Sequence, residues 1–346
     1  MIWGCGGVIL VIDKHGAYVS KRGETIVISV NGEKSDPIAA RNLSLVVTLG
    51  KVSFSNDALL LLAKYAVPVV FTTGWTPRAI FHPFFNHGTV ITRREQIKAY
   101  DDWRGLHLAK QFAISALENK ARFLLYLLRN RNNQSVRDIV NTAVTKIRFY
   151  VSRIESIEEP LHVSRSSILG FEGMGTKEYF NAFQLFFNEE LEFFERNRRP
   201  PRDPVNAALS FGYTLLYSKA LICVSATGLE PYAGFLHTDR SGKPSLMLDL
   251  AEEFKQWAVD RVVVRLFSMR ILSKQDFKIS EGRVLFTEDG KKKFLNAFSE
   301  RLNKKVSIRA SEEPVSIMRL LLQQARKIAR FVLQKDTRYE PFIWTP

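Results

Sequence analysis

The first fifty residues alternate short apolar runs with turn residues. Runs rich in Val, Ile and Thr are typical of strands, and the Gly and Asn residues between them are typical of turns. Ser55 is a suitable N-cap for a helix through DALLLLAKYA, and Pro68 begins a further apolar strand that ends at Gly74. The expected strands within residues 6–50 are GGVILVI, AYVSKRG, ETIVISVNGE and LSLVVTLG. This pattern predicts a small α+β unit.

The spacing of apolar residues changes to a helical period beyond residue 92. Leu106, Ala109, Phe112 and Leu117 recur at intervals of three to five residues within a helical run expected over 92–131. Further helices are expected at 135–155, 176–196, 205–227, 249–270, 291–301 and 312–334, with a short hairpin at 277–287.

The segment HPFFNHG, at residues 82–88, has no clear period and is rich in turn residues. It therefore places the boundary between the two parts of the chain. The fold class predicted is α+β overall, with a small β-rich N-terminal domain followed by a larger, mainly α-helical domain. We expect the first domain over 1–84, a linker over 85–91, and the helical domain over 92–346.

The net positive charge of the chain indicates a polyanionic partner. The chain has 50 Lys and Arg against 35 Asp and Glu, a net charge of +15. Residues 1–85 hold only 8 of those basic residues and 5 of the acidic ones, so most of the excess lies in the helical part. Such a balance favours nucleic acid first and an anionic membrane surface second.

The two cysteines, Cys5 and Cys223, give no disulfide framework and no zinc pattern, which fits a reducing compartment. The apolar start at Val8–Ile12 has no basic leader, so a buried strand explains it better than a signal peptide. A second apolar stretch is interrupted by Lys64 and Pro68 and is too short to span a bilayer. We therefore expect a cytoplasmic protein that has no membrane partner.

Candidate chemistry is concentrated in two segments. In GLEPYAGFLHTDRSGKPSLMLDLAEEF, His237 lies in a loop between Gly234 and Gly242, and Asp249 and Glu252 follow three residues apart, so a helix would present both on nearly one face. In LGFEGMGTKEYF, Glu172 lies in what we expect to be a glycine-bracketed turn before an aromatic helix. One imidazole with several carboxylates suits Mn²⁺ or Mg²⁺ better than zinc.

These residues predict a metal-dependent enzyme that acts on phosphodiesters, since a divalent ion can polarise a phosphoryl oxygen and activate a hydroxyl. A different helix rotation would present Glu253 in place of Glu252. Taken singly, each residue has a structural explanation: a turn glutamate, a hydrogen-bonded histidine, or acidic residues at a helix start. The combination favours the metal site.

Basic residues near these segments are candidates for phosphate contacts. Arg240 and Lys243 flank His237, while Arg198, Arg199 and Arg202 form a basic corner with Arg196 beside two prolines. Such groups position a phosphate backbone and do not read its sequence. A solvated loop is the alternative interpretation of the corner.

The chain also resembles a known family, the CRISPR adaptation integrase/endonuclease, the larger of the two universal CRISPR-associated spacer-acquisition proteins. The resemblance covers nearly the whole chain. It is carried by LSLVVTLGKVSFSNDALLLLAKYAVPVVFTT, FEGMGTKEYF, PVNAALSFGYTLLYSKAL, GLEPYAGFLHTDRSGKPSLMLDLAEEF, and QQARKIARFVL with YEPF. Lys177 stands where this family often has Arg, and Lys255 with Gln256 stand where Arg-Pro is common.

The resemblance implies that Glu172, His237 and Glu252 are ligands of Mn²⁺ or Mg²⁺ and that Asp249 is an additional active-site acid. Lys177 would retain its attraction for phosphate. The implied activity is that of a DNA endonuclease and integrase, in which the 3′-hydroxyl of a short double-stranded fragment attacks a phosphodiester of CRISPR repeat DNA. The implied assembly is a homodimer through the N-terminal part, and a small ferredoxin-like CRISPR-associated partner protein would bridge two such dimers.

Two other functions remain open from sequence. A hydrolytic nuclease that resolves branched or damaged DNA would use the same ligands, with water as the nucleophile. A non-catalytic basic DNA-binding scaffold would use the carboxylates only to cap helices. The metal, Mn²⁺ or Mg²⁺, also stays open, because both accept the same hard ligands.

Overall fold

A computed structural model gives the fold of the chain. It describes residues 8–12, 14–48, 50–73, 76–81, 83, 89–129, 131–198, 200–238, 242–280, 282–305 and 314–345. The chain forms two compact units. The first comprises residues 1–94 with 221–230, and the second comprises 95–220 with 231–346.

The first unit contains strands, as its alternating apolar runs predict, but these strands form two sheets where we expected one small sheet. One sheet has the order β1-β6-β8-β9, in which β1 (Val8–Ile12), β6 (Leu43–Thr48) and β8 (Val69–Thr73) are parallel and β9 (Thr76–Phe81) is antiparallel. The other sheet has the order β4-β3-β2-β7, with β5 paired to β3. Its strands are β2 (Ala17–Arg22), β3 (Thr25–Val30), β4 (Glu33–Lys34), β5 (Ile38–Ala39) and β7 (Val52–Phe54).

Helix α1 (Asn56–Lys64) begins where the sequence predicts, because the Ser55 side chain accepts a hydrogen bond from the Ala58 amide at 3.1 Å. Ala58 and Leu62 are fully buried in the core of this unit. The predicted β-rich N-terminal part is confirmed.

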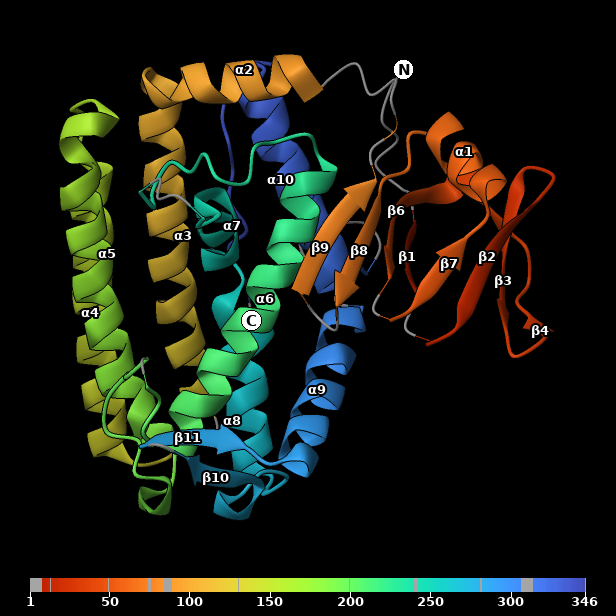
Figure 1. Cartoon of the computed structure of the whole chain (residues 1–346). Helices are drawn as coiled ribbons and strands as arrows, with labels where there is room; N and C mark the ends of the chain where they lie inside the picture. The colour runs from red at the N-terminus through yellow and green to blue at the C-terminus, as the bar shows by residue number, and fades with distance from the viewer. Residues whose placement is uncertain are drawn as a thin grey trace. The chain divides into compact units, whose positions relative to one another are not determined.

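The helical run predicted over 92–131 is wrong in one respect, because it divides into two helices (Figure 1). α2 (Thr89–Tyr100) ends before Asp101, and α3 (Trp103–Leu128) begins after Asp102, whose side chain accepts a hydrogen bond from the Arg104 amide at 2.8 Å. An aspartate at an N-cap starts a new helix in a new direction. The apolar period continues through both helices and hides this break.

Helix α5 (Leu161–Phe183) corrects the prediction of a glycine-bracketed turn at Glu172, because the whole FEGMG segment is helical. Figure 1 shows α3, α4 (Gln134–Glu155) and α5 side by side, and each packs on the other two. A Cβ at Gly175 would lie 2.5 Å from Leu117 Cδ2 on α3, so glycine permits this close packing. Tertiary packing therefore compensates for the low helix propensity of glycine.

The helix predicted over 176–196 ends earlier, at Phe183. Two short 3-10 turns follow, η2 (Gln184–Phe186) and η3 (Glu189–Leu191), and Glu192 adopts a left-handed conformation with φ 54°. Phe183 and Phe193 pack in the core, whereas Phe194 is 67% exposed.

Helix α6 (Pro204–Ala226) agrees with its prediction. Within the described ranges it is long and apolar enough to cross a membrane, but 67% of its most apolar window is buried inside the protein, as in a core helix. The helix predicted over 249–270 is instead three segments. α7 (Ser245–Glu252) starts before Asp249, a π-helical turn η4 spans Gln256–Asp260, and α8 covers Arg261–Ser268.

The remaining elements agree with prediction. β10 (Phe277–Ser280) and β11 (Arg283–Phe286) form the predicted antiparallel hairpin. The short 3-10 turn η5 (Lys274–Asp276) comes directly before β10. α9 (Glu288–Asn303) and α10 (Ile317–Val332) complete the second unit. The predicted fold class, β-rich and then mainly helical, is confirmed.

Candidate active site

Glu172 projects from the middle of α5 toward α3. Lys120 of α3 donates to its Oε1 at 2.9 Å, and Thr176, one turn later on α5, donates to the same oxygen at 2.6 Å. Burial opposes ionisation of this carboxyl, but the charge of Lys120 and the two hydrogen bonds lower its pKa to about 2. Glu172 is therefore a partly buried carboxylate whose ionised form is favoured.

Asp249 organises the loop that carries His237. Its carboxylate is fully buried and accepts hydrogen bonds from the backbone amides of Phe235, Leu236 and His237 at 2.7, 3.1 and 2.9 Å. A Cβ at Gly234 would lie 2.6 Å from Ser245 Cβ, so only glycine allows the loop to approach α7 this closely. Asp249 lies in the second turn of α7, and the prediction that it opens a helix is wrong.

The His237 ring has one nitrogen held and one available. Its Nδ1 lies 2.7 Å from Asp249 Oδ1, and its Nε2 lies 4.0 Å from Glu252 Oε1. Burial disfavours the charged imidazole, but the hydrogen bond to Asp249 and the nearby carboxylates outweigh it, so the pKa of His237 is raised. An Nδ1–H donated to Asp249 leaves the Nε2 lone pair free to bind a metal.

Glu252 lies at the last residue of α7 and is almost fully buried. Lys255 donates to its Oε1, and Lys120 also lowers the pKa of Glu252 by its charge, although burial and the charge of Glu172 oppose ionisation. Two carboxylates and two ammonium groups thus act on one another. With His237, Glu172 and Glu252 form what we call the carboxylate centre.

Glu253 faces away from the carboxylate centre. Its carboxyl accepts hydrogen bonds from the Tyr339 hydroxyl and, at 2.7 Å, from the Phe342 amide. Burial raises the pKa of Glu253 to about 8, despite these hydrogen bonds. Of the two neighbouring glutamates, Glu252 is therefore the one directed toward His237.

The carboxylate centre suits a hard divalent cation in the kind of donors it offers. Donor atoms that share one Mg²⁺ or Mn²⁺ are separated by roughly 3–4 Å, which is comparable with the 4.0 Å between His237 Nε2 and Glu252 Oε1. Within the described ranges, however, no three His, Cys, Asp or Glu residues are already spaced to hold an ion. Lys120 and Lys255 supply the positive charge to the two carboxylates in this arrangement, and an ion would displace those contacts.

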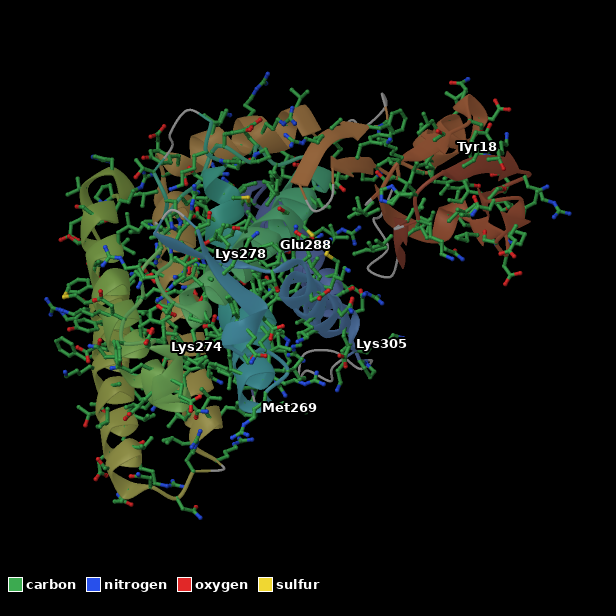
Figure 2. All side chains as sticks on the ribbon, turned by 60° about the horizontal axis from the view of Figure 1, so that its bottom comes forward. Tyr18, Met269, Lys274, Lys278, Glu288 and Lys305 are labelled. Carbon is green, nitrogen blue, oxygen red and sulfur yellow. The ribbon has the colours of Figure 1, made fainter. Side chains whose placement is uncertain are left out.

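The residues predicted to bind phosphates do not all fall in described segments. Arg199 and Arg240 lie outside the described residues. Lys177, Arg198, Arg202 and Lys243 are exposed. Lys177 follows Glu172 by five residues on α5, and Lys243 precedes α7. Further exposed basic residues, Lys274, Lys278 and Lys305, project from the second unit (Figure 2).

Arg196 of the basic corner has a structural role. Its guanidinium donates to Asn206 Oδ1 at 2.6 Å and to Ser210 Oγ at 3.0 Å, and it lies 5.6 Å from the centre of the Tyr213 ring. These contacts tie the loop before α6 to that helix.

Sequence reasoning missed Lys120, Thr176 and Lys255. Thr176 and Lys255 stand four and three residues after Glu172 and Glu252, a spacing that could have suggested contact on one helix face. Lys120 gives no such signal, because its contact with Glu172 depends on how α3 packs on α5.

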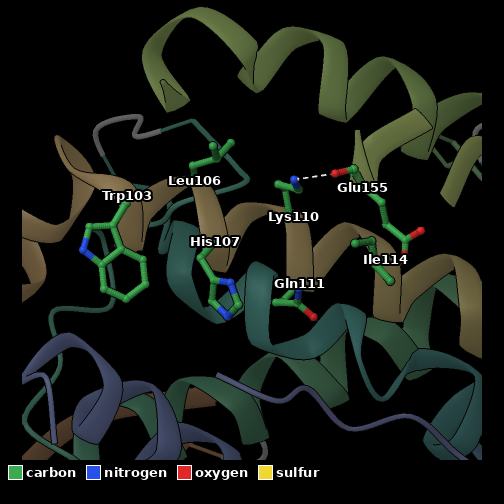
Figure 3. Close-up of a pocket in the computed structure, with 7 residues that line it drawn as sticks. All are labelled: Trp103, Leu106, His107, Lys110, Gln111, Ile114 and Glu155. Atoms are coloured by element: carbon green, nitrogen blue, oxygen red, sulfur yellow. Dashed lines mark hydrogen bonds between the residues drawn. The ribbon is translucent and has the colours of Figure 1, made fainter. Parts of the chain in front are cut away.

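A pocket of about 350 Å³ lies elsewhere, along α3 (Figure 3). It is lined by Trp103, Leu106, His107, Lys110, Gln111, Ile114 and Glu155. Lys110 donates to the backbone carbonyls of Glu155 and Ile157, both at 2.7 Å, and His107 Nε2 accepts from the Tyr339 amide. Lys110 and His107 are thus engaged within the fold, and the pocket shares no residue with the carboxylate centre.

Comparison with known proteins identifies the family. The model of the family described as CRISPR associated protein Cas1 matches residues 10–300. A CRISPR-associated endonuclease Cas1 from Archaeoglobus fulgidus is 34% identical over 345 residues, covering 96% of this chain and 99% of the relative. The chain belongs to the Cas1 family.

Solved structures show the same fold. The structure of a partial Cas6-RT-Cas1–Cas2 complex superposes with a TM-score of 0.78 at 21% identity, covering 98% of both chains. A casposase bound to its integration product superposes with a TM-score of 0.73 at 22% identity, covering 98% of this chain and 99% of the casposase.

Proposed function

We propose that this protein is a metal-dependent DNA endonuclease and integrase that inserts short DNA fragments into a CRISPR array as new spacers. Membership of the Cas1 family supports the reaction class, and the curated relatives are named endonucleases. The observation that carries the proposal is a set of linked contacts: Lys120 pairs with Glu172, Lys255 pairs with Glu252, and His237 Nε2 lies 4.0 Å from Glu252 Oε1. The charges of Glu172 and Lys120 also act on Glu252. The casposase of similar fold, bound to an integration product, supports strand joining.

In this proposal Glu172, Glu252 and His237 hold one Mn²⁺ or Mg²⁺. When bound, such an ion neutralises charge that develops on the phosphoryl oxygens during in-line displacement. Asp249 fixes the His237 tautomer and the position of the loop, so it acts as a positioning residue. Lys120 and Lys255 favour the ionised form of both glutamates, although Glu252 is buried and Glu172 is partly buried.

DNA binding in this proposal depends on the basic surface of the second unit. Lys177 and Lys243 are adjacent in sequence to the elements of the carboxylate centre, and Arg198 and Arg202 extend the surface. Arg199 and Arg240 belong to the same proposed set. These side chains attract phosphates, so affinity should fall with salt by about 0.9 log units per phosphate neutralised for each tenfold rise in concentration.

The proposed assembly is a homodimer in the cytoplasm that works with a small ferredoxin-like CRISPR-associated partner. The similar structure that contains both Cas1 and Cas2 supports such a partner. Double-stranded fragments and CRISPR repeat DNA are the proposed substrates.

Hydrolysis without joining is the second candidate, since the curated relatives carry the name endonuclease. The nucleophile would then be water instead of a 3′-hydroxyl at the same carboxylate centre. The two reactions differ in whether a covalent junction forms between fragment and target.

A joining assay tests the proposal. Protein, partner, a labelled DNA fragment and a supercoiled plasmid with a CRISPR repeat are incubated with Mn²⁺ or with EDTA. We expect labelled plasmid only with Mn²⁺, and none with Glu172→Ala. Glu158→Ala removes an exposed glutamate between α4 and α5 and serves as a matched control that should join normally. Cutting without joining would support the hydrolytic alternative, and joining in EDTA would refute both.

A further inference from the structure

Three arginines gather around three aromatic rings in the second unit. Arg261 Cζ lies 5.0 Å from the centres of the Tyr126 and Trp257 rings and 6.0 Å from that of Trp344. Arg301 Cζ lies 4.0 Å from the Trp257 ring centre, and Arg129 Cζ lies 6.0 Å from that of Tyr126. We call these six residues, from α3, η4, α8, α9 and the C-terminal segment, the arginine–aromatic cluster.

No carboxylate of the described residues pairs with the positive charges of this cluster. Within the described part of the chain, Arg129, Arg261 and Arg301 form no ion pair, in contrast to Lys120 and Lys255 at the carboxylate centre. Burial and the adjacent charge of Arg261 lower the pKa of Arg301 to about 10. Aromatic faces hold the guanidinium groups in place, and cation–π attraction leaves their N–H donors free.

Some of those donors are buried and have no hydrogen-bond acceptor. Arg301 donates from Nε to the Trp257 carbonyl at 3.0 Å, but its second terminal nitrogen has no partner and is shielded from solvent. The indole nitrogen of Trp257, a residue only 7% exposed, is also unpartnered. Among the described residues no acceptor serves these two nitrogens, and because both are shielded from solvent, a ligand would reach Arg301 through its exposed atoms instead.

The cluster is joined to the carboxylate centre through the backbone. Trp257 follows Lys255 by two residues, and the Trp344 amide donates at 2.7 Å to Asn119, the neighbour of Lys120. Arg261, Arg301 and Tyr126 are only partly buried, so a ligand can reach them.

We propose that the arginine–aromatic cluster binds a backbone phosphate of DNA, with Arg261 and Arg301 donating to its oxygens and Arg129 adding long-range attraction. Guanidinium groups without an ion pair match a phosphate, because their fork of N–H donors fits its oxygens. Of the three rings, Trp257 and Trp344 are buried, and the partly exposed Tyr126 is the one that can meet the face of a base. An acidic protein surface would use the charges but not the Tyr126 ring. The proposal rests on the proposed function for the nature of the ligand, but it involves residues separate from the carboxylate centre.

The test is DNA binding without catalysis. Fluorescence anisotropy of a labelled DNA fragment in EDTA, at 0.05–0.3 M salt, compares wild type with Arg301→Gln and Arg261→Gln. Loss of one phosphate contact should flatten the salt dependence by about 0.9 log units per decade and weaken binding at 0.1 M salt about eightfold. Arg301→Lys should retain the salt slope, since it keeps the charge.

A matched control removes the same charge from a different cation–π pair. Arg153→Gln affects an exposed arginine 5.9 Å from the Phe171 ring centre, and its binding curve should follow that of wild type. Thermal unfolding distinguishes a structural role: the Arg301→Gln protein should keep a cooperative transition near the wild-type melting temperature, since Arg301 is only partly buried.

Wild-type affinity and salt slope in both glutamine variants would overturn the proposal, as would an equal loss in Arg153→Gln. Unchanged DNA binding with loss of the protein partner would instead assign the cluster to an acidic protein. The proposed function is tested separately. If the wild-type protein joins no DNA but Arg301→Gln still weakens DNA binding, the phosphate site is supported and the integrase activity is refuted.

Discussion

Replacement of Glu253 by Gln is expected to make stability less dependent on pH. The Glu253 carboxyl is fully buried, and its hydrogen bonds to Tyr339 and to the Phe342 amide hold the C-terminal segment against the end of α7. Gln has the same shape and can preserve both contacts, since its oxygen accepts from the amide and its NH₂ group donates to the hydroxyl. The substitution therefore removes mainly the ionisable proton.

The sign follows from the pKa values. Burial raises the pKa of Glu253 from 4.5 to about 8 in the folded protein. The associated stability is fully present below about pH 4.5 and is lost as the pH rises toward 8, because only the unfolded chain releases the proton in that range. At 1.36 kcal/mol per pKa unit, the loss for wild type reaches about 5 kcal/mol.

Urea unfolding at pH 5, 6, 7 and 8 measures this difference. The Glu253→Gln protein should resemble wild type at pH 5 and exceed its free energy of unfolding by several kcal/mol at pH 8. Glu158→Gln, at an exposed position, controls for the loss of one carboxyl. Parallel pH profiles for wild type and Glu253→Gln would refute the assignment of a buried, protonated carboxyl.

Three further predictions follow from contacts around the carboxylate centre. Asp249→Asn should lower Mn²⁺ affinity about 10- to 100-fold by calorimetry, because it disturbs the tautomer of a proposed ligand; wild-type affinity would contradict that role. Gly175→Ala should reduce the free energy of unfolding in urea by about 1–3 kcal/mol, because the added methyl group clashes with Leu117. Gly173→Ala meets no atom within 4 Å, so it should raise that free energy by up to about 1 kcal/mol. Equal effects of the two substitutions would refute the packing argument. Lys120→Met should lower the melting temperature, and Mn²⁺ should then raise that temperature more than it does in wild type, because the ion replaces the lost positive charge. An equal increase in wild type and variant would contradict the idea that Lys120 and the ion neutralise the same carboxylates.

Much of the fold could be predicted from sequence, because local signals agree with tertiary packing over most elements. Strand alternation, the Ser55 cap and the hairpin at 277–287 are encoded by neighbouring residues. The break between α2 and α3 was missed because one aspartate cap is a weaker signal than a continuous apolar period. The glycines of α5 predicted a turn where the chain is helical, because close packing of Gly175 on Leu117 outweighs the low helix propensity of glycine.

The candidate site was predictable in its residues but not in their surroundings. The sequence places an imidazole and carboxylates near one another along the chain. It does not show that the Asp249 carboxylate accepts hydrogen bonds from three backbone amides. Nor does it show that Lys120 pairs with Glu172, because that contact joins α3 to α5 across the fold. Which of Glu252 and Glu253 faces His237 depends on where α7 starts. The acidic residues suggested a start at Asp249, whereas the helix starts at Ser245.

Mn²⁺ binding tests the central claim most directly. Titration calorimetry or electron paramagnetic resonance, on wild type and on the single variants Glu172→Ala, His237→Ala and Glu252→Ala, counts the ions bound by each chain. We predict one ion for each wild-type chain and a loss of that site in every variant, with DNA binding in EDTA retained. A wild-type stoichiometry and affinity in any of the three variants would contradict the convergence of these side chains on one cation.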